Sequence, residues 1–160
     1  MSITLQIIQA SDLDEIVQFE QKISEKLVPD EMERTMQSWH ARWRKESLDH
    51  YLPMGWSFLA RSDSTKELVG YFIAQPLLFF DGFTQTLWVE HMQFINESVR
   101  DQLCEVAYKL SREKHFQKVL FPKEITPHAQ ALSQYINNFK SENWQPQVLS
   151  AWTAKVSPPR

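Results

Sequence analysis

Glycine and cysteine are scarce in this chain, with three glycines and one cysteine among 160 residues. Because Cys104 is the single cysteine, no internal disulfide can form, and a zinc site built from several cysteines is excluded. No apolar run approaches the roughly 20 residues of a membrane-spanning helix. The N-terminus shows no basic segment before an apolar stretch and no cleavage signature. We therefore expect a cytoplasmic protein without a membrane partner.

A strong charge of either sign is also lacking, since 17 Lys and Arg stand against 20 Asp and Glu. The cations are interleaved with acids, as in RWRKE at 42–46, and form no basic stripe. Nucleic-acid binding needs clustered cations, so no nucleic-acid partner is expected. What is present is 42% hydrophobic residues, enough to fill a core, and a length that suits one domain over 1–160.

Hydrophobic periodicity predicts a strand and two helices in the first third of the chain. Alternation over 3–9 indicates the strand. The first helix is predicted over 12–25, where one polar residue, Glu20, interrupts an otherwise apolar stripe. The second helix is predicted over 30–49, after Pro29 and with acids in its first turn. Its apolar side chains are expected to share one face: Met32, Met36, Trp39 and Trp43.

The remainder of the chain is predicted to combine strands with two more helices. The helices cover the periodic stripe from Val99 to Leu110 and a segment from Pro127 to Phe139. The order is β-α-α-β-β-β-α-β-α-β, which defines an α+β protein with a mostly antiparallel sheet flanked by about four helices. The predicted strands, with Asp81-Gly82 as a hairpin turn, are 55–61, 67–74 with an extension to Phe80, 84–94, 118–121 and 147–156.

Three segments carry a resemblance to a known family: LVGYFIA (68–74), LWVEHMQF (87–94) and LCEVAYKLSREKHFQKV (103–119). In order and spacing they look like the third strand, the fourth strand and the central helix with the fifth strand of the GNAT superfamily, the Gcn5-related N-acyltransferases. The resemblance extends from Ile3 to about Tyr135. It implies the GNAT fold and an enzyme that moves an acyl group from acyl-CoA to a primary amine.

The family binds the coenzyme A pyrophosphate on a glycine-rich turn, Gln/Arg-x-x-Gly-x-Gly/Ala, between its fourth strand and its central helix. The matching segment here, INESVRDQ (95–102), has no glycine and carries two acids, Glu97 and Asp101. It is also shorter than the family's turn by roughly one helical turn. We therefore predict a divergent member whose phosphate cradle is lost or much reduced.

If acetyl-CoA is held at all, the resemblance gives its positions. Backbone groups of Phe94 would hold the pantetheine arm, and Asn96, Ser98, Val99 and Arg100 would lie at the pyrophosphate. Asn96 or Ser98 can instead cap the helix. Arg100 can meet a phosphate, pair with Glu97 or point to water, and we favour a solvated side chain.

Glu90 is the foremost catalytic candidate. Strand alternation places it on one face with Trp88, Met92 and Phe94, where an apolar setting raises the pKa of a carboxyl group and suits a general base. The resemblance implies the same role, because some members carry a glutamate on this strand. The alternative, which we favour, is a structural carboxylate that is hydrogen-bonded to a backbone bulge or a neighbouring arginine.

His91 and Tyr135 are further candidates. Alternation places His91 on the opposite face, with Leu87, Val89 and Gln93, where a packed and hydrogen-bonded histidine is expected. Tyr135 resembles the family's tyrosine that protonates the departing thiolate, and a core tyrosine is the alternative.

Trp39 and Trp43 lie where the family shapes its acceptor pocket, which makes them the substrate-binding candidates, although such a pair is also typical of a core or a partner interface. His40 and His50 have no companion ligands nearby in the sequence, so no metal is expected. Only about one strand follows Trp144 where the family closes with a hairpin. A homodimer that completes the sheet edge is therefore a hypothesis.

Three functions fit these observations. The first is a GNAT-fold protein with weak or lost acetyl-CoA use that binds a ligand, such as a small amine, or a protein partner in the remaining cleft. The second is an active N-acetyltransferase with Glu90 as base and Tyr135 as acid. The third is a scaffolding role through the Trp-rich helix. We favour the first over the second.

Overall fold

A computed structural model describes residues 2–80, 82–122 and 146–149 of the chain. Short 3-10 helices at Ala10–Asp12 and Leu52–Met54 accompany the main elements. The main elements are β1 Ile3–Ile7, α1 Leu13–Leu27, α2 Glu31–Ser38, α3 Lys45–Tyr51, β2 Phe58–Ser62, β3 Leu68–Phe80, β4 Phe83–Phe94, α4 Glu97–Glu113, β5 Lys118–Pro122 and β6 Pro146–Leu149.

One six-stranded sheet joins these elements in the order β1-β2-β3-β4-β5-β6. Strands β1 to β4 are antiparallel to one another in sequence order, and β5 and β6 each run parallel to the strand before them. This mixed, mostly antiparallel sheet confirms the predicted α+β class. The predicted strand at 147–156 is described only as β6, and the predicted helix from Pro127 to Phe139 lies outside the described residues.

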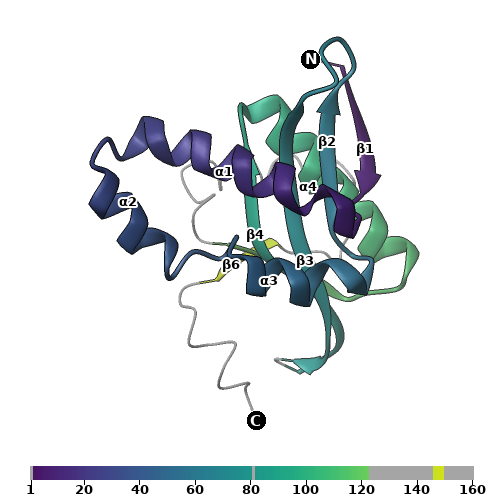
Figure 1. Cartoon of the computed structure of the whole chain (residues 1–160). Coiled ribbons are helices and arrows are strands. Elements are labelled where there is room, and N and C mark those ends of the chain that lie inside the picture. Colours follow the sequence, from purple (N-terminus) through teal and green to yellow (C-terminus); the bar gives the residue numbers. More distant parts are fainter. Residues whose placement is uncertain (1, 81, 123–145, 150–160) are drawn as a thin grey trace.

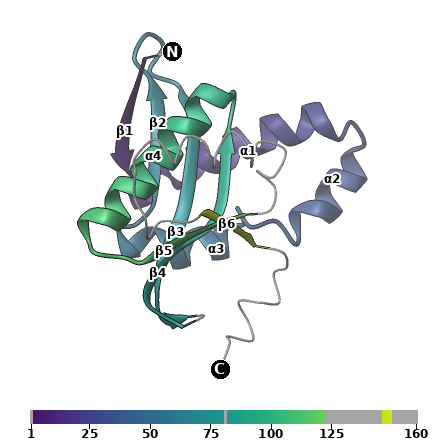
Figure 2. The same ribbon diagram turned by 180° about the vertical axis from the view of Figure 1, so that it is seen from behind.

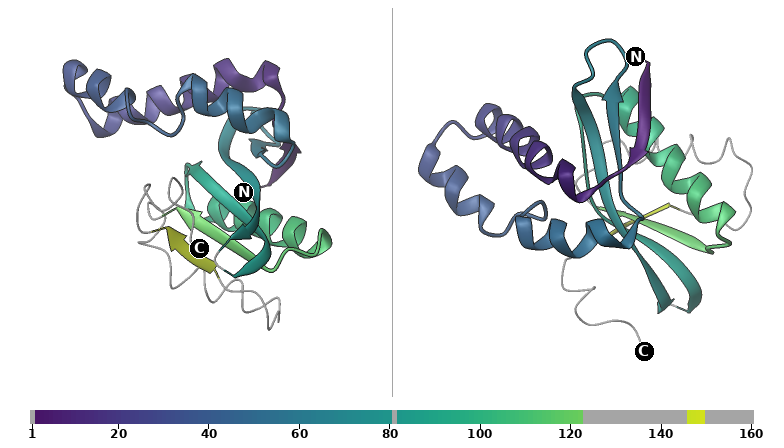
Figure 3. Two further views of the ribbon diagram at one scale, coloured as in Figure 1. Left: turned by 90° about the horizontal axis from the view of Figure 1, so that it is seen from below. Right: turned by 45° about the vertical axis from the view of Figure 1, so that its right-hand side comes forward.

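Helices cover both faces of the sheet and define two separate cores. Figure 1 shows α1 and α3 in front of the strands, Figure 2 shows α4 on the opposite side, and the left view of Figure 3 shows the resulting layers. Burial of one large apolar side chain contributes about 1.5–3 kcal/mol, so the two cores dominate the stability. Beneath α4 the core contains Phe72, Leu87, Val89, Leu103, Cys104 and Ala107, and beneath α1 and α3 it contains Ile16, Leu48, Leu59, Tyr71 and Ile73.

The predicted helix over 30–49 is wrong, because the chain forms two helices, α2 and α3, that run in different directions (Figure 1). The connection between them is held by Arg44, whose Nη1 donates a hydrogen bond to the Trp39 carbonyl oxygen at 2.7 Å. That bond satisfies a carbonyl at the end of α2, where no further helical turn can do so. The expected apolar face does not form, since Met32, Met36 and Trp39 are 72%, 53% and 60% exposed.

A β-bulge interrupts the pairing of β3 with β4. Ile73 is paired with His91, whereas the next residue, Ala74, is paired with Val89. Glu90 is therefore an extra residue in β4. In a bulge of this kind, two residues of one strand oppose a single residue of the other, and the strand's side chains are re-aimed.

The bulge overturns the alternation predicted for β4. Val89 and Met92, on either side of it, both lie in the core beneath α4. Glu90 and His91 both face the α1 and α3 side, where each bonds to a helix residue. The predicted faces are wrong because strict alternation holds only in an unbroken ladder. Glu90 does not share a face with Met92 and Phe94, and His91 does not share one with Leu87 and Val89.

Replacement of Gly70 by alanine tests how closely α4 packs on β3. A Cβ atom at this position would lie 2.6 Å from Val99 Cγ1, 3.0 Å from the Gln93 carbonyl oxygen and 3.1 Å from Leu103 Cδ1. We expect Gly70→Ala to lower the free energy of unfolding by about 1–3 kcal/mol, the usual cost of overpacking, in urea titrations. Adding Val99→Ala removes the closest contact, so the double variant should lose less than the sum of the single variants. Strictly additive losses would contradict this packing.

Candidate functional site

Glu20 is a buried carboxylate at the centre of a hydrogen-bond cluster between α1 and the sheet. It is 3% exposed, on the face of α1 that packs against the strands. Its Oε1 lies 2.6 Å from both the Tyr71 hydroxyl and His91 Nε2, and its Oε2 accepts from Gln93 Nε2 at 3.4 Å. Three donors thus offset the cost of removing this carboxylate from water.

The cluster fixes the state of two of its members. Because His91 Nε2 faces a carboxylate oxygen, that nitrogen carries a proton in both the neutral and the charged ring. Burial, followed by the negative charge of Glu20 and the hydrogen bond to it, raises the pKa of Tyr71 well above its ordinary value. Tyr71 is therefore a fixed hydrogen-bond donor and His91 is oriented by Glu20.

Glu90 is 1% exposed and is more deeply buried than His91, the next residue of β4. Its Oε2 accepts hydrogen bonds from the Tyr51 hydroxyl and from Trp88 Nε1, both at 2.7 Å. Gln75 Nε2 lies 3.4 Å from the same Tyr51 hydroxyl. These bonds tie α3 to β3 and β4. A role for Glu90 as general base stays a prediction.

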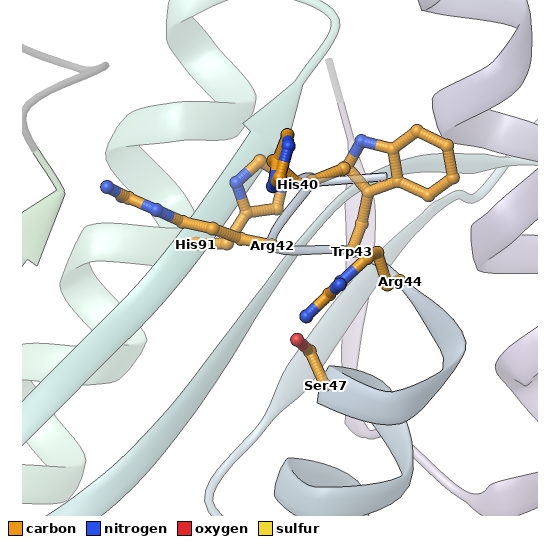
Figure 4. Close-up of a pocket in the computed structure, with 7 residues that line it drawn as sticks. His40, Arg42, Trp43, Arg44, Ser47 and His91 are labelled. Carbon is orange, nitrogen blue, oxygen red and sulfur yellow. The ribbon is translucent and has the colours of Figure 1, made fainter. Parts of the chain in front are cut away.

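A cavity of about 540 Å³ opens beside the bulge, between β4 and the connection from α2 to α3, and we call it the His91 cavity (Figure 4). Arg42 lies over the bulge, with Nη1 3.4 Å from the carbonyl oxygen of Glu90. Trp43 lines the cavity, whereas Trp39, the other predicted substrate-binding residue, is not among the described lining residues. Those lining residues are His40, Ala41, Arg42, Trp43, Arg44, Ser47 and His91.

The first turn of α4 is capped by its own chain. Asn96 is the N-cap residue, and its side-chain oxygen accepts from the Val99 N–H at 3.0 Å. Val99 is fully buried, while Ser98 is exposed and its carbonyl and hydroxyl oxygens each lie 3.4 Å from Gln102 Nε2. The Phe94 N–H, one residue before the turn, donates to the Gln93 side-chain oxygen at 3.2 Å.

Arg100 is buried, so the predicted solvated side chain is wrong. It is 1% exposed, and its Nη2 and Nε donate to Asp101 Oδ1 at 2.7 Å and 2.9 Å. Its Nη1 has no hydrogen-bond partner among the described residues. The cause is its position on α4, one turn before the buried Leu103 and Cys104, which places it on the inward face of the helix.

The ladder between β4 and β5 is short. It pairs Thr86, Leu87 and Trp88 of β4 with Lys118, Val119 and Leu120 of β5. In the part of the chain that the structure describes, the rest of β4 from Val89 to Phe94 is paired with β3 alone. Among the described residues, the stretch of β4 that contains the bulge and leads into α4 therefore has a neighbouring strand on one edge only.

Two further features are absent from the described residues. No helix there is long and apolar enough to cross a membrane. No group of three or more His, Cys, Asp or Glu side chains gathers there in a way that would hold a metal ion. Tyr135, the predicted general acid, lies outside the described residues.

The sequence signals for this site were weak but partly present. Glu20 was the single polar residue in the apolar stripe predicted for 12–25, and a buried polar residue of that kind needs partners. For His91 the sequence favours a packed residue over a catalytic one, because alternation places it on the opposite face from Glu90. Arg42, Arg44 and Ser47 had no signal, because they come together through a turn that the predicted helix over 30–49 did not contain.

Comparison with known proteins shows a shared fold. No family model matches the chain, and no curated protein matches it. Among solved structures it is similar to TTHA1254 from Thermus thermophilus: the wild type has a TM-score of 0.55 at 17% identity and a point mutant 0.56 at 18%, each covering 92% of this chain and 95% of that chain. An acetyltransferase of the GNAT family from Staphylococcus aureus has a TM-score of 0.48 at 16% identity, covering 86% of this chain and 83% of that chain.

Stability at high pH tests the bond between Tyr71 and Glu20. Unfolded tyrosine ionises near pH ~10, whereas buried Tyr71 keeps its proton to higher pH. The contribution of Tyr71 to the free energy of unfolding is therefore full below about pH 10 and is lost as the pH rises from there through the raised pKa of Tyr71. We expect urea titrations at about pH 9 and about pH 11 to show a larger loss of unfolding free energy for the wild type than for Tyr71→Phe. Equal losses would contradict the raised pKa of Tyr71.

Proposed function

We propose that this chain is a divergent GNAT-fold protein with weak or lost acetyl-CoA use, which acts by binding a small ligand in the His91 cavity. The order of the described elements supports the fold, since the three family-like segments fall on β3, β4 and the pair α4 and β5. The cavity supports the mode of action, because its volume lies within the usual 300–1,000 Å³ of a small-molecule site.

The start of α4 fits a coenzyme A pyrophosphate poorly. Helix N-termini bind phosphate through backbone N–H groups that point at the ligand. Here the Asn96 side chain already accepts from the Val99 N–H, and no glycine occurs between residues 83 and 160. Glu97 adds a negative charge in the same turn. This charge interacts favourably with the helix dipole and repels a second anion such as a phosphate.

The observation that carries the proposal is the burial of Arg100. This guanidinium is the only cation in 95–102, yet it is 1% exposed and forms two short bonds to Asp101. A cation that is already paired inside the protein offers little to a phosphate in solvent, because a new ligand would have to replace a charge-assisted pair.

A second candidate, an active N-acyltransferase, is favoured by one specific observation. His91 lies on the wall of the cavity with Nε2 bonded to Glu20, so in the neutral ring its Nδ1 carries the lone pair and can accept a proton. An acyl-CoA would supply the activated acyl group, and this chain would supply the base and the amine site. In this candidate Glu90 or His91 is the base, Tyr135 is the acid and Phe94 backbone groups meet the pantetheine arm.

A thermal-melt titration with acetyl-CoA tests the first proposal. A ligand that binds only the folded state stabilises it by about 2.7 kcal/mol at roughly a hundred times its dissociation constant. We expect no concentration-dependent rise in melting temperature up to millimolar acetyl-CoA. Free coenzyme A serves as the control for adventitious binding of the nucleotide part, and a GNAT enzyme of known activity serves as the positive control. A saturable rise would refute the loss of acetyl-CoA binding.

Two substitutions separate the bases of the second candidate in an amine-acceptor screen with acetyl-CoA. General-base catalysis contributes typically 10²–10⁴-fold, so removal of the base should lower kcat by at least about a hundredfold. Because His91 lies on the cavity wall, we expect any turnover to collapse in His91→Gln and to survive in Glu90→Gln. Melting curves of both variants check that the fold persists. Loss of turnover in Glu90→Gln alone would identify Glu90 as the general base. Unchanged turnover in both variants would exclude both residues as general bases.

A further inference from the structure

We infer that the His91 cavity selects a small organic anion, with a carboxylate or phosphate group bound by Arg44 and an apolar part against Trp43. This inference rests on the proposed function, since it names the chemistry of the ligand for the same cavity. It goes beyond that function by excluding simple cationic amines as the preferred ligand.

The charge of the lining points to an anion. Two of the seven described lining residues are arginines, two are histidines, and none is Asp or Glu. An arginine side chain stays protonated at any physiological pH. Arg44 makes no ion pair with another described residue, and the one hydrogen bond of its guanidinium there goes to the Trp39 carbonyl oxygen. A backbone carbonyl holds the guanidinium in place without cancelling its charge.

The geometry of the cavity suits a small ligand with a charged end. Figure 4 shows the Arg44 guanidinium directed toward the Ser47 hydroxyl, with the Trp43 indole and His91 on other sides of the same space. Arginine presents several N–H donors in a planar fork that matches carboxylate and phosphate oxygens, and a hydroxyl adds one more donor. The indole supplies an apolar surface for the rest of the ligand.

Among the described residues, the carboxylate of Glu20 bonds to a residue that lines the cavity without lining it itself. Glu20 bonds to His91 Nε2, but it is 3% exposed and is not among the described lining residues. It therefore orients the imidazole from behind. A cationic amine entering the cavity would meet Arg44 without a facing acid in the described lining, and like charges disfavour it.

Calorimetric titration with three probes of similar size tests the inference at low ionic strength. Phenylacetate carries a carboxylate, phenyl phosphate carries a phosphate, and phenylacetamide is the neutral match of the first. We expect one or both anions to bind about tenfold or more tightly than phenylacetamide, as one charge-assisted bond allows. The stronger of the two anions identifies the acidic group. Equal binding of the amide, or no binding of either anion at millimolar concentration, would overturn the inference.

Variants then place the binding in this cavity. Arg44→Gln should weaken the bound anion about tenfold. Arg34→Gln is the matched control, because Arg34 also donates to backbone carbonyls, those of Val28 and Pro29 at 2.8 Å, and does not line this cavity. If Arg44→Gln fails to fold, Ser47→Asp gives an independent test.

Ser47→Asp puts a negative charge into the cavity while favouring the fold, because an acid in the first turn of α3 complements the helix dipole. It should abolish anion binding without lowering the melting temperature, while Ser47→Ala, which removes one donor and adds no charge, should weaken binding only severalfold. Anion binding that survives Ser47→Asp would refute this location. The acetyl-CoA titration is a separate measurement, so loss of acetyl-CoA use and anion selectivity can fail independently. Tight binding of phenylacetamide alone would keep the ligand cavity and reject only its preference for anions.

Discussion

The β-bulge at Glu90 is the constraint on which the rest of the site depends. One extra residue in β4 turns two consecutive side chains, Glu90 and His91, toward the same helical layer. It also turns the Glu90 carbonyl toward Arg42. Without it, His91 would lie among the core residues beneath α4, where a polar ring has no partner. A local irregularity in the ladder thus creates the wall of the cavity.

Two buried carboxylates hold the helices α1 and α3 against the sheet at the bulge. Glu20 joins α1 to Tyr71 and His91, and Glu90 joins α3 to the strands through Tyr51 and Trp88. Removing one partner of a buried charged group typically costs about 3–5 kcal/mol, so both helices are held firmly in place. The connection from α2 to α3 carries Arg42 and Arg44 of the cavity. In the chain it lies between α1 and α3, the two helices that these carboxylates hold against the sheet.

Much of the fold was predictable from the sequence, and most of the site was not. Alternation and the Asp81-Gly82 turn located β3 and β4, and the apolar period from Val99 to Leu110 located α4, because these signals are local. The bulge depends on the register between two strands, and the burial of Arg100 depends on tertiary packing. The break between α2 and α3 depends on a bond from Arg44 to a carbonyl five residues earlier. None of these contacts leaves a periodic trace in the sequence.

We propose that ligands of this protein bind at the His91 cavity and not at the start of α4. Residue-resolved ¹H–¹⁵N NMR titration tests it most directly, with coenzyme A and phenylacetate added to separate samples. We expect phenylacetate to shift the amide signals of His40, Trp43, Ser47 and His91. We also expect coenzyme A to leave those of Ser98, Val99 and Arg100 unchanged. Saturable coenzyme A shifts at Ser98 to Arg100, with no response around His91, would contradict this proposal.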